Sequence, residues 1–202
     1  MTFLEILRLP AQALSARKLL YAFAFLAVFG AVVFPSDLPA YREGGQTASD
    51  SALVHFIEDY GRHVTTIAAF GAPIVLRDWT GLKQLLVVTV AGILATHGPK
   101  RLLNGIVVFG TRLGERPQSP NSNHNMPSGH SALASAATWF LARRYSWGWL
   151  WLGIPVMLLT MWTRLMLNAH TVSAVIAGCL IGLVVASLFV TARNRKREQA
   201  TA

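Results

Sequence analysis

The sequence predicts an all-α fold: an integral membrane bundle of six transmembrane helices, forming a single domain over residues 1–202. Three observations predict it. Apolar residues make up 53% of the chain and charged residues only 13%, whereas a soluble domain carries about a quarter charged residues. The apolar residues gather in long stretches, and basic residues gather in short segments between several of those stretches. Cys179 is the only cysteine, which excludes an intramolecular disulfide.

Six apolar stretches occur along the chain, at residues 19–35, 64–76, 84–108, 128–142, 146–166 and 171–191. A helix that spans a bilayer needs about 20 mostly apolar residues. The first, fifth and sixth stretches reach or approach that length. The third is long enough, but Lys100 and Arg101 interrupt it, so we expect its outer part to leave the bilayer. The second and fourth are marginal, and we expect them inside the bundle, where small residues favour close helix packing.

The N-terminal segment carries two predictions. The apolar run from Leu19 to Phe34 lacks a small-residue cleavage site, so we expect a retained span and not a cleaved signal peptide. Residues 1–18 mix apolar with basic and polar side chains. We expect them to form either an interfacial helix on the cytoplasmic surface or a frayed basic leader.

The formal net charge is +9, which is also seen in nucleic-acid-binding proteins. Here the basic residues cluster between apolar spans, so the positive-inside rule explains them better, and we expect no nucleic-acid partner. Six spans place both termini on one side. The following basic groups then share the cytoplasmic face: Arg8, Arg17, Lys18, Arg77, Lys83, Arg143, Arg144 and a basic cytoplasmic tail at 193–202.

The opposite face carries residues 36–63, 109–127 and 164–170. No eukaryotic targeting signal is evident. We therefore expect a multi-pass protein of a bacterial inner membrane, with this second face toward the periplasm.

Two arginines and a helix start on the periplasmic face indicate a phosphate site. Arg116 and Arg164 supply planar, permanently charged forks that match phosphate oxygens. Ser128 and Gly129 follow Pro127 and open the fourth apolar stretch. A helix N-terminus offers free backbone N–H groups to an anion, and glycine lets the backbone approach closely. Ser128 can donate its hydroxyl to the phosphate or simply cap the helix.

His130 and His170 lie on the same predicted membrane face. One histidine can attack phosphorus while the other protonates the leaving oxygen. A lone histidine near a membrane interface is usually structural. Two histidines together with two arginines favour catalysis.

These residues resemble the motifs of the type-2 phosphatidic acid phosphatase family of membrane lipid phosphatases. The match consists of Arg116-Pro117, then Pro127-Ser128-Gly129-His130, then Arg164 and His170. It runs from about residue 100 to 174. The resemblance implies that His170 is the nucleophile of a phosphohistidine intermediate and His130 the general acid. It also implies that Arg116, Arg164, Ser128 and the Gly129 amide bind phosphate, with no metal and no cofactor.

The chain departs from the family pattern at the lysine that precedes Arg116 in the first motif. The family's lysine belongs at position 109, where this chain has Phe109. Either Lys100, near the outer end of the third stretch, or Arg112, within the loop, supplies the missing charge, and we favour Lys100. Thr163 replaces the serine before Arg164, which is a mild change.

The serious departure is Ala174, which occupies the position of the carboxylate that orients His170 in the family. Such a carboxylate fixes the histidine tautomer and stabilises the imidazolium. Ser173, Asn168 or a backbone carbonyl is a candidate to take over the hydrogen bond to Nδ1. The alternatives are a weakened enzyme, a protein that no longer catalyses, and an inactivating substitution.

The function predicted first is a metal-independent, periplasm-facing lipid phosphatase. Its candidate substrates are undecaprenyl pyrophosphate, phosphatidylglycerol phosphate, phosphatidic acid and the phosphates of lipid A. A lipid phosphotransferase would pass through the same phosphohistidine and stays an alternative. A catalytically impaired homologue that binds phosphorylated lipid is a second alternative, favoured by Ala174 and Phe109. The sequence does not determine the oligomeric state.

Overall fold

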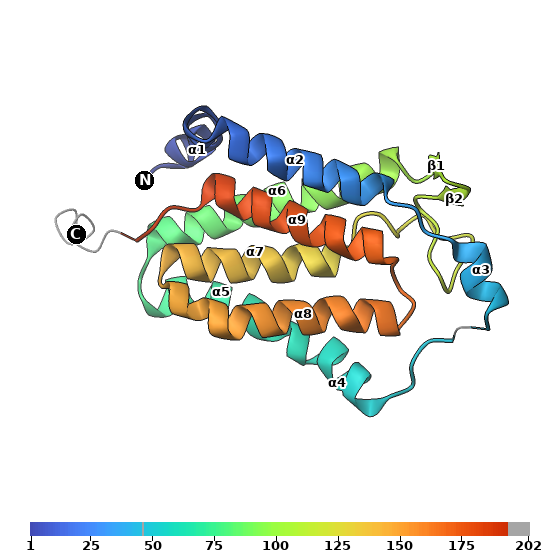
Figure 1. The fold of residues 1–202 in the computed structure, drawn as a ribbon. Helices are drawn as coiled ribbons and strands as arrows, with labels where there is room; N and C mark the ends of the chain where they lie inside the picture. The colour runs from blue at the N-terminus through green and yellow to red at the C-terminus, as the bar shows by residue number, and fades with distance from the viewer. Residues whose placement is uncertain (46, 194–202) are drawn as a thin grey trace.

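The computed structural model describes residues 1–45 and 47–193, and it is mostly helical (Figure 1). The helices are α1 Phe3–Ala16, α2 Lys18–Val33, α3 Leu38–Glu43, α4 Ala52–Asp59, η1 Gly61–His63, α5 Val64–Val75, α6 Trp79–Leu102, α7 Gly129–Arg144, η2 Trp147–Trp149, α8 Leu150–Met166 and α9 Val172–Phe189. The strands β1 Val107–Val108 and β2 Thr111–Arg112 form one short antiparallel hairpin. The all-α class is therefore confirmed.

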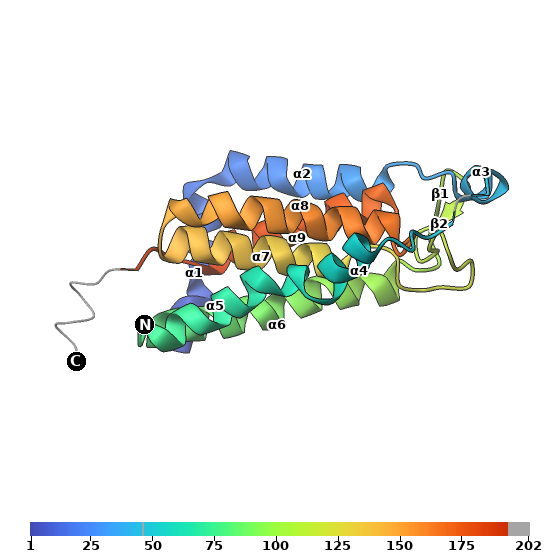
Figure 2. The same cartoon turned by 90° about the horizontal axis from the view of Figure 1, so that it is seen from below.

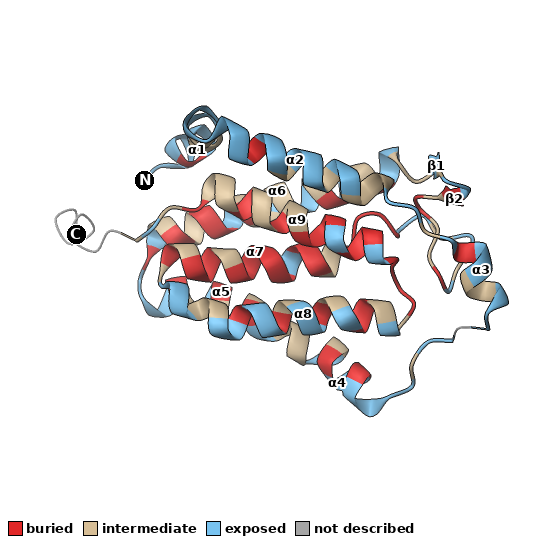
Figure 3. Cartoon of the chain, viewed as in Figure 1, coloured by how far each residue is buried: buried red, intermediate tan, exposed pale blue. Residues whose placement is uncertain are grey.

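Helices α2, α5, α6, α7, α8 and α9 run alongside one another, with α7 in the middle (Figures 1 and 2). Helix α7 packs against α5, α6, α8 and α9. Helices α7 and α9 each contain more buried residues than any other helix (Figure 3). Close packing of this pair depends on two glycines. A Cβ atom at Gly178 would lie 2.2 Å from the carbonyl oxygen of Ser128, and one at Gly182 would lie 2.1 Å from that of Ala132.

The outer surface of the bundle is apolar. Phe23 on α2 is 69% exposed and Trp151 on α8 is 88% exposed, and Leu94 on α6 is also largely exposed. Soluble monomers rarely expose contiguous apolar patches of this extent. The surface therefore suits contact with lipid, as expected of a membrane protein.

Within the described residues, three helical segments are long and apolar enough to cross a membrane: Trp79–Leu102, Trp147–Met166 and Val172–Phe189. The number rises to four if α1 and α2, which are bent by 100° at their junction, count as one broken span. Helix α5 has only 12 residues, and the 16 residues of α7 are mostly small or polar. The six-span arrangement therefore stays a prediction.

The N-terminal residues form a helix and not a frayed leader. A capping box between Thr2 and Glu5 begins α1, and the helix turns sharply into α2. Ile6 is fully buried, while Leu4 and Leu7 are exposed. Of the predicted basic tail at 193–202, only Arg193 lies within the described residues.

The third apolar stretch, predicted at 84–108, ends sooner as a helix. Helix α6 stops at Leu102, just after Lys100 and Arg101. The residues beyond it enter the β1–β2 hairpin, whose turn places Phe109 and Gly110 at positive φ. The polar break in the stretch thus coincides with the end of the helix.

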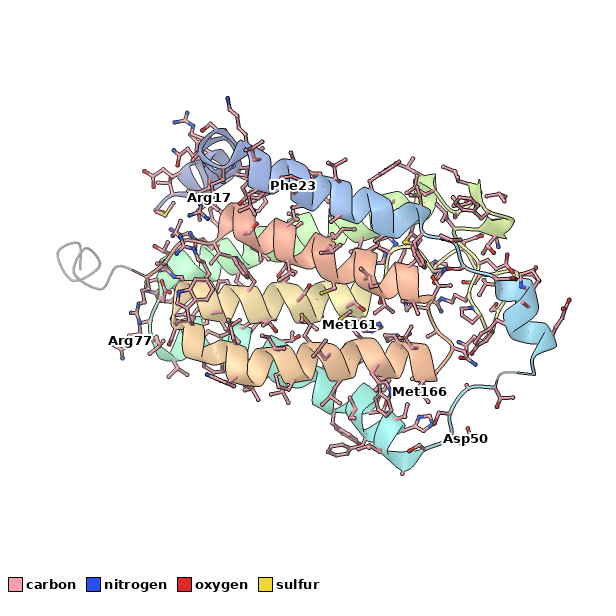
Figure 4. All side chains as sticks on the ribbon, in the orientation of Figure 1. Arg17, Phe23, Asp50, Arg77, Met161 and Met166 are labelled. Carbon is pink, nitrogen blue, oxygen red and sulfur yellow. The ribbon has the colours of Figure 1, made fainter. Side chains whose placement is uncertain are left out.

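Arg17 and Arg77 lie at one end of the bundle, and Asp50 lies at the other (Figure 4). At the end that carries Arg77, the buried side chain of Asp78 accepts hydrogen bonds from Arg144 at 2.7 and 2.5 Å and from Tyr145 at 3.1 Å. These bonds tie the turn between α5 and α6 to the end of α7.

Candidate functional site

The predicted site residues gather at the end of the bundle that carries Asp50. Lys100 lies near the end of α6, His130 in the first turn of α7, and Arg164 near the end of α8. His170 precedes α9, and Arg116 lies in the loop between β2 and α7. A cavity of about 470 Å³ is lined at this end by Lys100, Arg116, Gly129, His130 and His170.

Arg116 and Arg164 each leave one buried donor available for an anion. Within the described residues, the Nε atoms of both arginines are buried without a hydrogen-bond partner. Leaving a buried polar group unsatisfied costs about 1–3 kcal/mol, and more for a charged group. Arg116 lines the adjoining cavity, so a phosphate there would accept from its Nε, whereas Arg164 is not among the residues that line it. The arrangement therefore fits a phosphate group.

The start of α7 adjoins the cavity through Gly129. Gly129 lies close to the lysine, since a Cβ atom at Gly129 would be 3.9 Å from Nζ of Lys100. The first-turn N–H groups of a helix have no intrahelical partners and favour an anion.

Ser128 was predicted either to bind phosphate or to cap the helix. Its side chain is fully buried and caps α7 by accepting a hydrogen bond from the Ser131 amide at 3.4 Å. Its own amide donates to the carbonyl oxygen of Ala174 at 2.9 Å. Ser128 is not part of the cavity wall. Its geometry is that of a helix cap, which was the alternative to phosphate binding.

His170 is held in one orientation. It is only 2% exposed, and its Nδ1 lies 2.8 Å from the backbone carbonyl oxygen of Asn125. A carbonyl can only accept, so Nδ1 donates and Nε2 keeps its lone pair. Burial, then the positive charges of Arg164, Arg116 and Lys100, hold the pKa of His170 well below its ordinary value. The imidazole is therefore neutral at pH 7, as a nucleophile requires.

The structure separates the two candidates for the missing basic residue. Lys100 is 8% exposed and lines the cavity. Arg112 is instead bound to the loop segments before and after it. Its Nη atoms donate to the carbonyl oxygens of Asn104, Pro120 and Ser122, and to the side chain of Asn123. The preference for Lys100 agrees with this placement, whereas Arg112 has a structural position.

Glu58 is the main residue of the site region that the sequence did not indicate. Its carboxylate accepts hydrogen bonds from Arg164 at 2.5 Å and from Arg62 at 2.7 Å. It also accepts one from the hydroxyl of Thr163 at 3.3 Å, so the threonine that replaces the family's serine uses its hydroxyl here. Glu58 is one of several acidic residues in the segment 36–63, and no local pattern distinguishes it.

Asn125 and Thr171 were also missed. The sequence offers only their positions as a signal: Thr171 follows His170, and Asn125 precedes Met126 and Pro127. No group of three or more histidine, cysteine, aspartate or glutamate side chains with the arrangement of a metal site occurs among residues 1–45 and 47–193.

Comparison with known proteins places this chain among lipid phosphatases. Residues 55–198 match the PAP2 superfamily. Two lipid A 1-phosphatases of Helicobacter pylori, from strains ATCC 700392 / 26695 and J99 / ATCC 700824, are 42% identical to the chain over 143 and 142 residues. These alignments cover 70% of this chain, and 74% and 73% of the two relatives.

A lipid A 4'-phosphatase of Helicobacter pylori strain J99 is 33% identical over 126 residues, which is 61% of this chain and 63% of the relative. No solved structure matches the chain. The family match covers most of the chain and includes every motif residue from Lys100 to His170. The resemblance of the motifs is thus confirmed, and the chain belongs to the PAP2 superfamily.

Proposed function

We propose that this protein is a lipid phosphatase that removes a phosphate group from a lipid of the lipid A type through a phosphohistidine on His170. The observation that carries the proposal is the cavity, because it joins the cationic phosphate site to an apolar groove inside the bundle.

The groove follows α6 from Lys100 down to Leu85. These residues are fifteen positions apart, which is about 22 Å along a helix. Its other walls include Phe70 of α5 and Leu133 and Ala136 of α7. A cationic end and a long apolar wall suit an amphiphile with its phosphate at the site and an acyl chain along the groove. A small water-soluble phosphate ester would leave most of this apolar surface uncovered.

The proposed reaction has two steps. Nε2 of His170 attacks phosphorus while the P–O bond to the lipid breaks, and His130 gives a proton to the leaving oxygen. Water then attacks the phosphohistidine, the P–N bond breaks, and His130 takes a proton from that water. Lys100, Arg116, Arg164 and the Gly129 amide would stabilise the negative charge on the phosphoryl oxygens in both steps.

The names of the relatives favour lipid A phosphates over the other three candidate lipids. Hydrolysis and transfer differ only in the acceptor that attacks the phosphohistidine. The test is phosphate release by the purified, detergent-solubilised protein from all four lipids, with a chelator and no added metal.

His170→Ala is the inactive comparison, and His55→Ala is its matched control because His55 is exposed on α4. We expect release from lipid A that His170→Ala abolishes and His55→Ala leaves unchanged. Release that survives in His170→Ala would overturn the mechanism. Transfer of labelled phosphate to a second lipid without release would identify a phosphotransferase.

We also propose that six spans embed the protein in a bacterial inner membrane with the site facing the periplasm. The basic residues at the end opposite the site support this orientation. A membrane-impermeant maleimide tests it, since the single native cysteine, Cys179, is buried. In spheroplasts, Asn123→Cys in the site loop should react at once. Arg17→Cys should react only after permeabilisation, and the reverse pattern would overturn the orientation.

A further inference from the structure

The orienting carboxylate of the family is missing here, yet His170 is not left without an orienting partner. Its Nδ1 lies 2.8 Å from the backbone carbonyl oxygen of Asn125, and both residues are buried. The two side chains that were candidates for this bond are engaged elsewhere. The Ser173 hydroxyl bonds to Thr171 at 2.9 Å and to Ser36 at 3.2 Å. The Asn168 side chain accepts from the hydroxyl of Tyr41.

The carbonyl of Asn125 is itself held in place from two directions. The Asn125 side chain forms a two-bond clamp with the residue after His170: its Nδ2 donates to Thr171 Oγ1 at 3.1 Å, and its Oδ1 accepts from the Thr171 amide at 3.0 Å. On the main chain, the amide of Asn125 donates to Gly114 at 3.1 Å, and the amide of Met126 donates to Leu113 at 3.2 Å. The acceptor and the histidine therefore belong to one rigid unit.

The side chain at position 174 packs among apolar residues, and the backbone carbonyl there accepts a hydrogen bond from a residue other than His170. Ala174 is 0% exposed and belongs to an apolar cluster with Leu113, Met126 and Ala177. Its carbonyl oxygen accepts the hydrogen bond from the Ser128 amide. The backbone at 174 thus fixes the start of α7, while its side chain leaves room for the segment that carries Asn125.

We propose that the backbone carbonyl of Asn125 replaces the missing carboxylate, and that the clamp between Asn125 and Thr171 is the positioning device of the nucleophile. The carbonyl accepts from Nδ1–H and so keeps the lone pair of His170 on Nε2. This inference rests on the proposed function for its catalytic meaning. The orientation itself can be measured without any substrate.

The first measurement is the tautomer of His170, read by nitrogen-15 NMR of the full-length protein in detergent at neutral pH. His170→Gln identifies the signal by its loss. Neutral histidine in water favours the Nε2–H form, so a fixed Nδ1–H form would require a partner on Nδ1. We expect His170 in the Nδ1–H form. The Nε2–H form in the wild type would overturn the proposal, even if no variant folds.

The second measurement uses variants of the clamp. Asn125→Ala removes both bonds to Thr171 and should give a mixture of tautomers. It should also lower kcat for phosphate release by up to about a hundredfold, the loss associated with misplacing a reactive group by about 1 Å. KM should stay unchanged, because the phosphate-binding arginines are untouched. Asn125→Asp should restore most of kcat, since its carboxylate accepts from the Thr171 amide and from the Thr171 hydroxyl.

The matched control is Asn123→Ala. Asn123 lies in the same loop and is exposed, and its replacement removes only a hydrogen bond with Arg112. It should keep the wild-type tautomer and kcat. A wild-type tautomer in Asn125→Ala would overturn the proposal. The two proposals can also fail separately. If the wild type shows the Nδ1–H form, Asn125→Ala loses it, and the protein hydrolyses none of the four lipids, the positioning device is supported and the proposed function is overturned.

Discussion

The carboxylate of Glu58 accepts a hydrogen bond from Nη1 of Arg164 across 2.5 Å, and it thereby joins the short helix α4 to the end of α8. Both side chains are largely buried. The bond engages Nη1 of the guanidinium, while its buried Nε has no hydrogen-bond partner within the described residues. A residue of the segment 36–63, outside the family motifs, thus bonds to an arginine of the family motif.

Glu58→Gln should weaken catalysis because the amide keeps the shape but loses the charge that holds Arg164. A hydrogen bond to a charged group contributes about 1.5–3 kcal/mol, so we expect kcat/KM to fall about tenfold to a hundredfold. The measurement is steady-state phosphate release. Asp59→Asn, at the next position and exposed, is the matched control and should behave as wild type. Wild-type kcat/KM in Glu58→Gln would mean that Arg164 is oriented without this carboxylate.

Lys100→Met and Arg112→Met should separate a catalytic cation from a structural one. Lys100 is buried beside Arg116 and Arg164, so its removal should raise the melting temperature by relieving repulsion. It should also lower kcat/KM by roughly a hundredfold, the usual loss of a donor to a developing anion. Arg112→Met should instead lower the melting temperature and only weaken activity, since it frees the loop carbonyls. The opposite ranking of activities would assign the phosphate site to Arg112.

The buried, neutral His170 should make the protein sensitive to mild acid. Its pKa is lowered in the folded state, first by burial and then by Arg164, Arg116 and Lys100. Unfolded histidine titrates near pH 6.5, roughly its reference value. Below that pH the unfolded chain takes up a proton that the folded protein does not, so stability is lost as pH falls and is unaffected above it.

The melting temperature of the wild type should therefore drop more between pH 7 and pH 5 than that of His170→Gln. His55→Gln, at an exposed position, should follow the wild type. Parallel curves for wild type and His170→Gln would show that His170 titrates normally.

Ala174→Asp, which restores the residue of the family pattern, should not raise activity. The position is fully buried in the cluster of Leu113, Met126 and Ala177, and Nδ1 of His170 already has the Asn125 carbonyl. Burying a carboxylate there without a partner is costly. We expect lower stability and a kcat at or below the wild-type value. A clear increase in kcat, with Ala174→Ser unchanged as the size control, would show instead that the site lacks an orienting group.

Several site features were predictable because they depend on local sequence. The candidates Arg116, His130, Arg164 and His170 follow from their residue types and from the resemblance to the family motifs, and charge and hydropathy place them at the ends of apolar stretches. The choice of Lys100 over Arg112 was only a preference from sequence. It depends on how the chain folds back between α6 and α7, which no local pattern records. The sequence left Ser128 with two roles, capping or phosphate binding, and the cap is seen only in the structure.

The sequence by itself determined the helical membrane class, the family and the candidate site residues, because hydrophobic length and the family motifs are properties of the chain. Only the tertiary structure decided that Glu58 holds Arg164 and that a carbonyl 45 residues before His170 bonds to its Nδ1. Contacts of that kind arise from packing between distant segments. A backbone carbonyl, moreover, is present at every residue, so nothing in the order of side chains marks the one that is used.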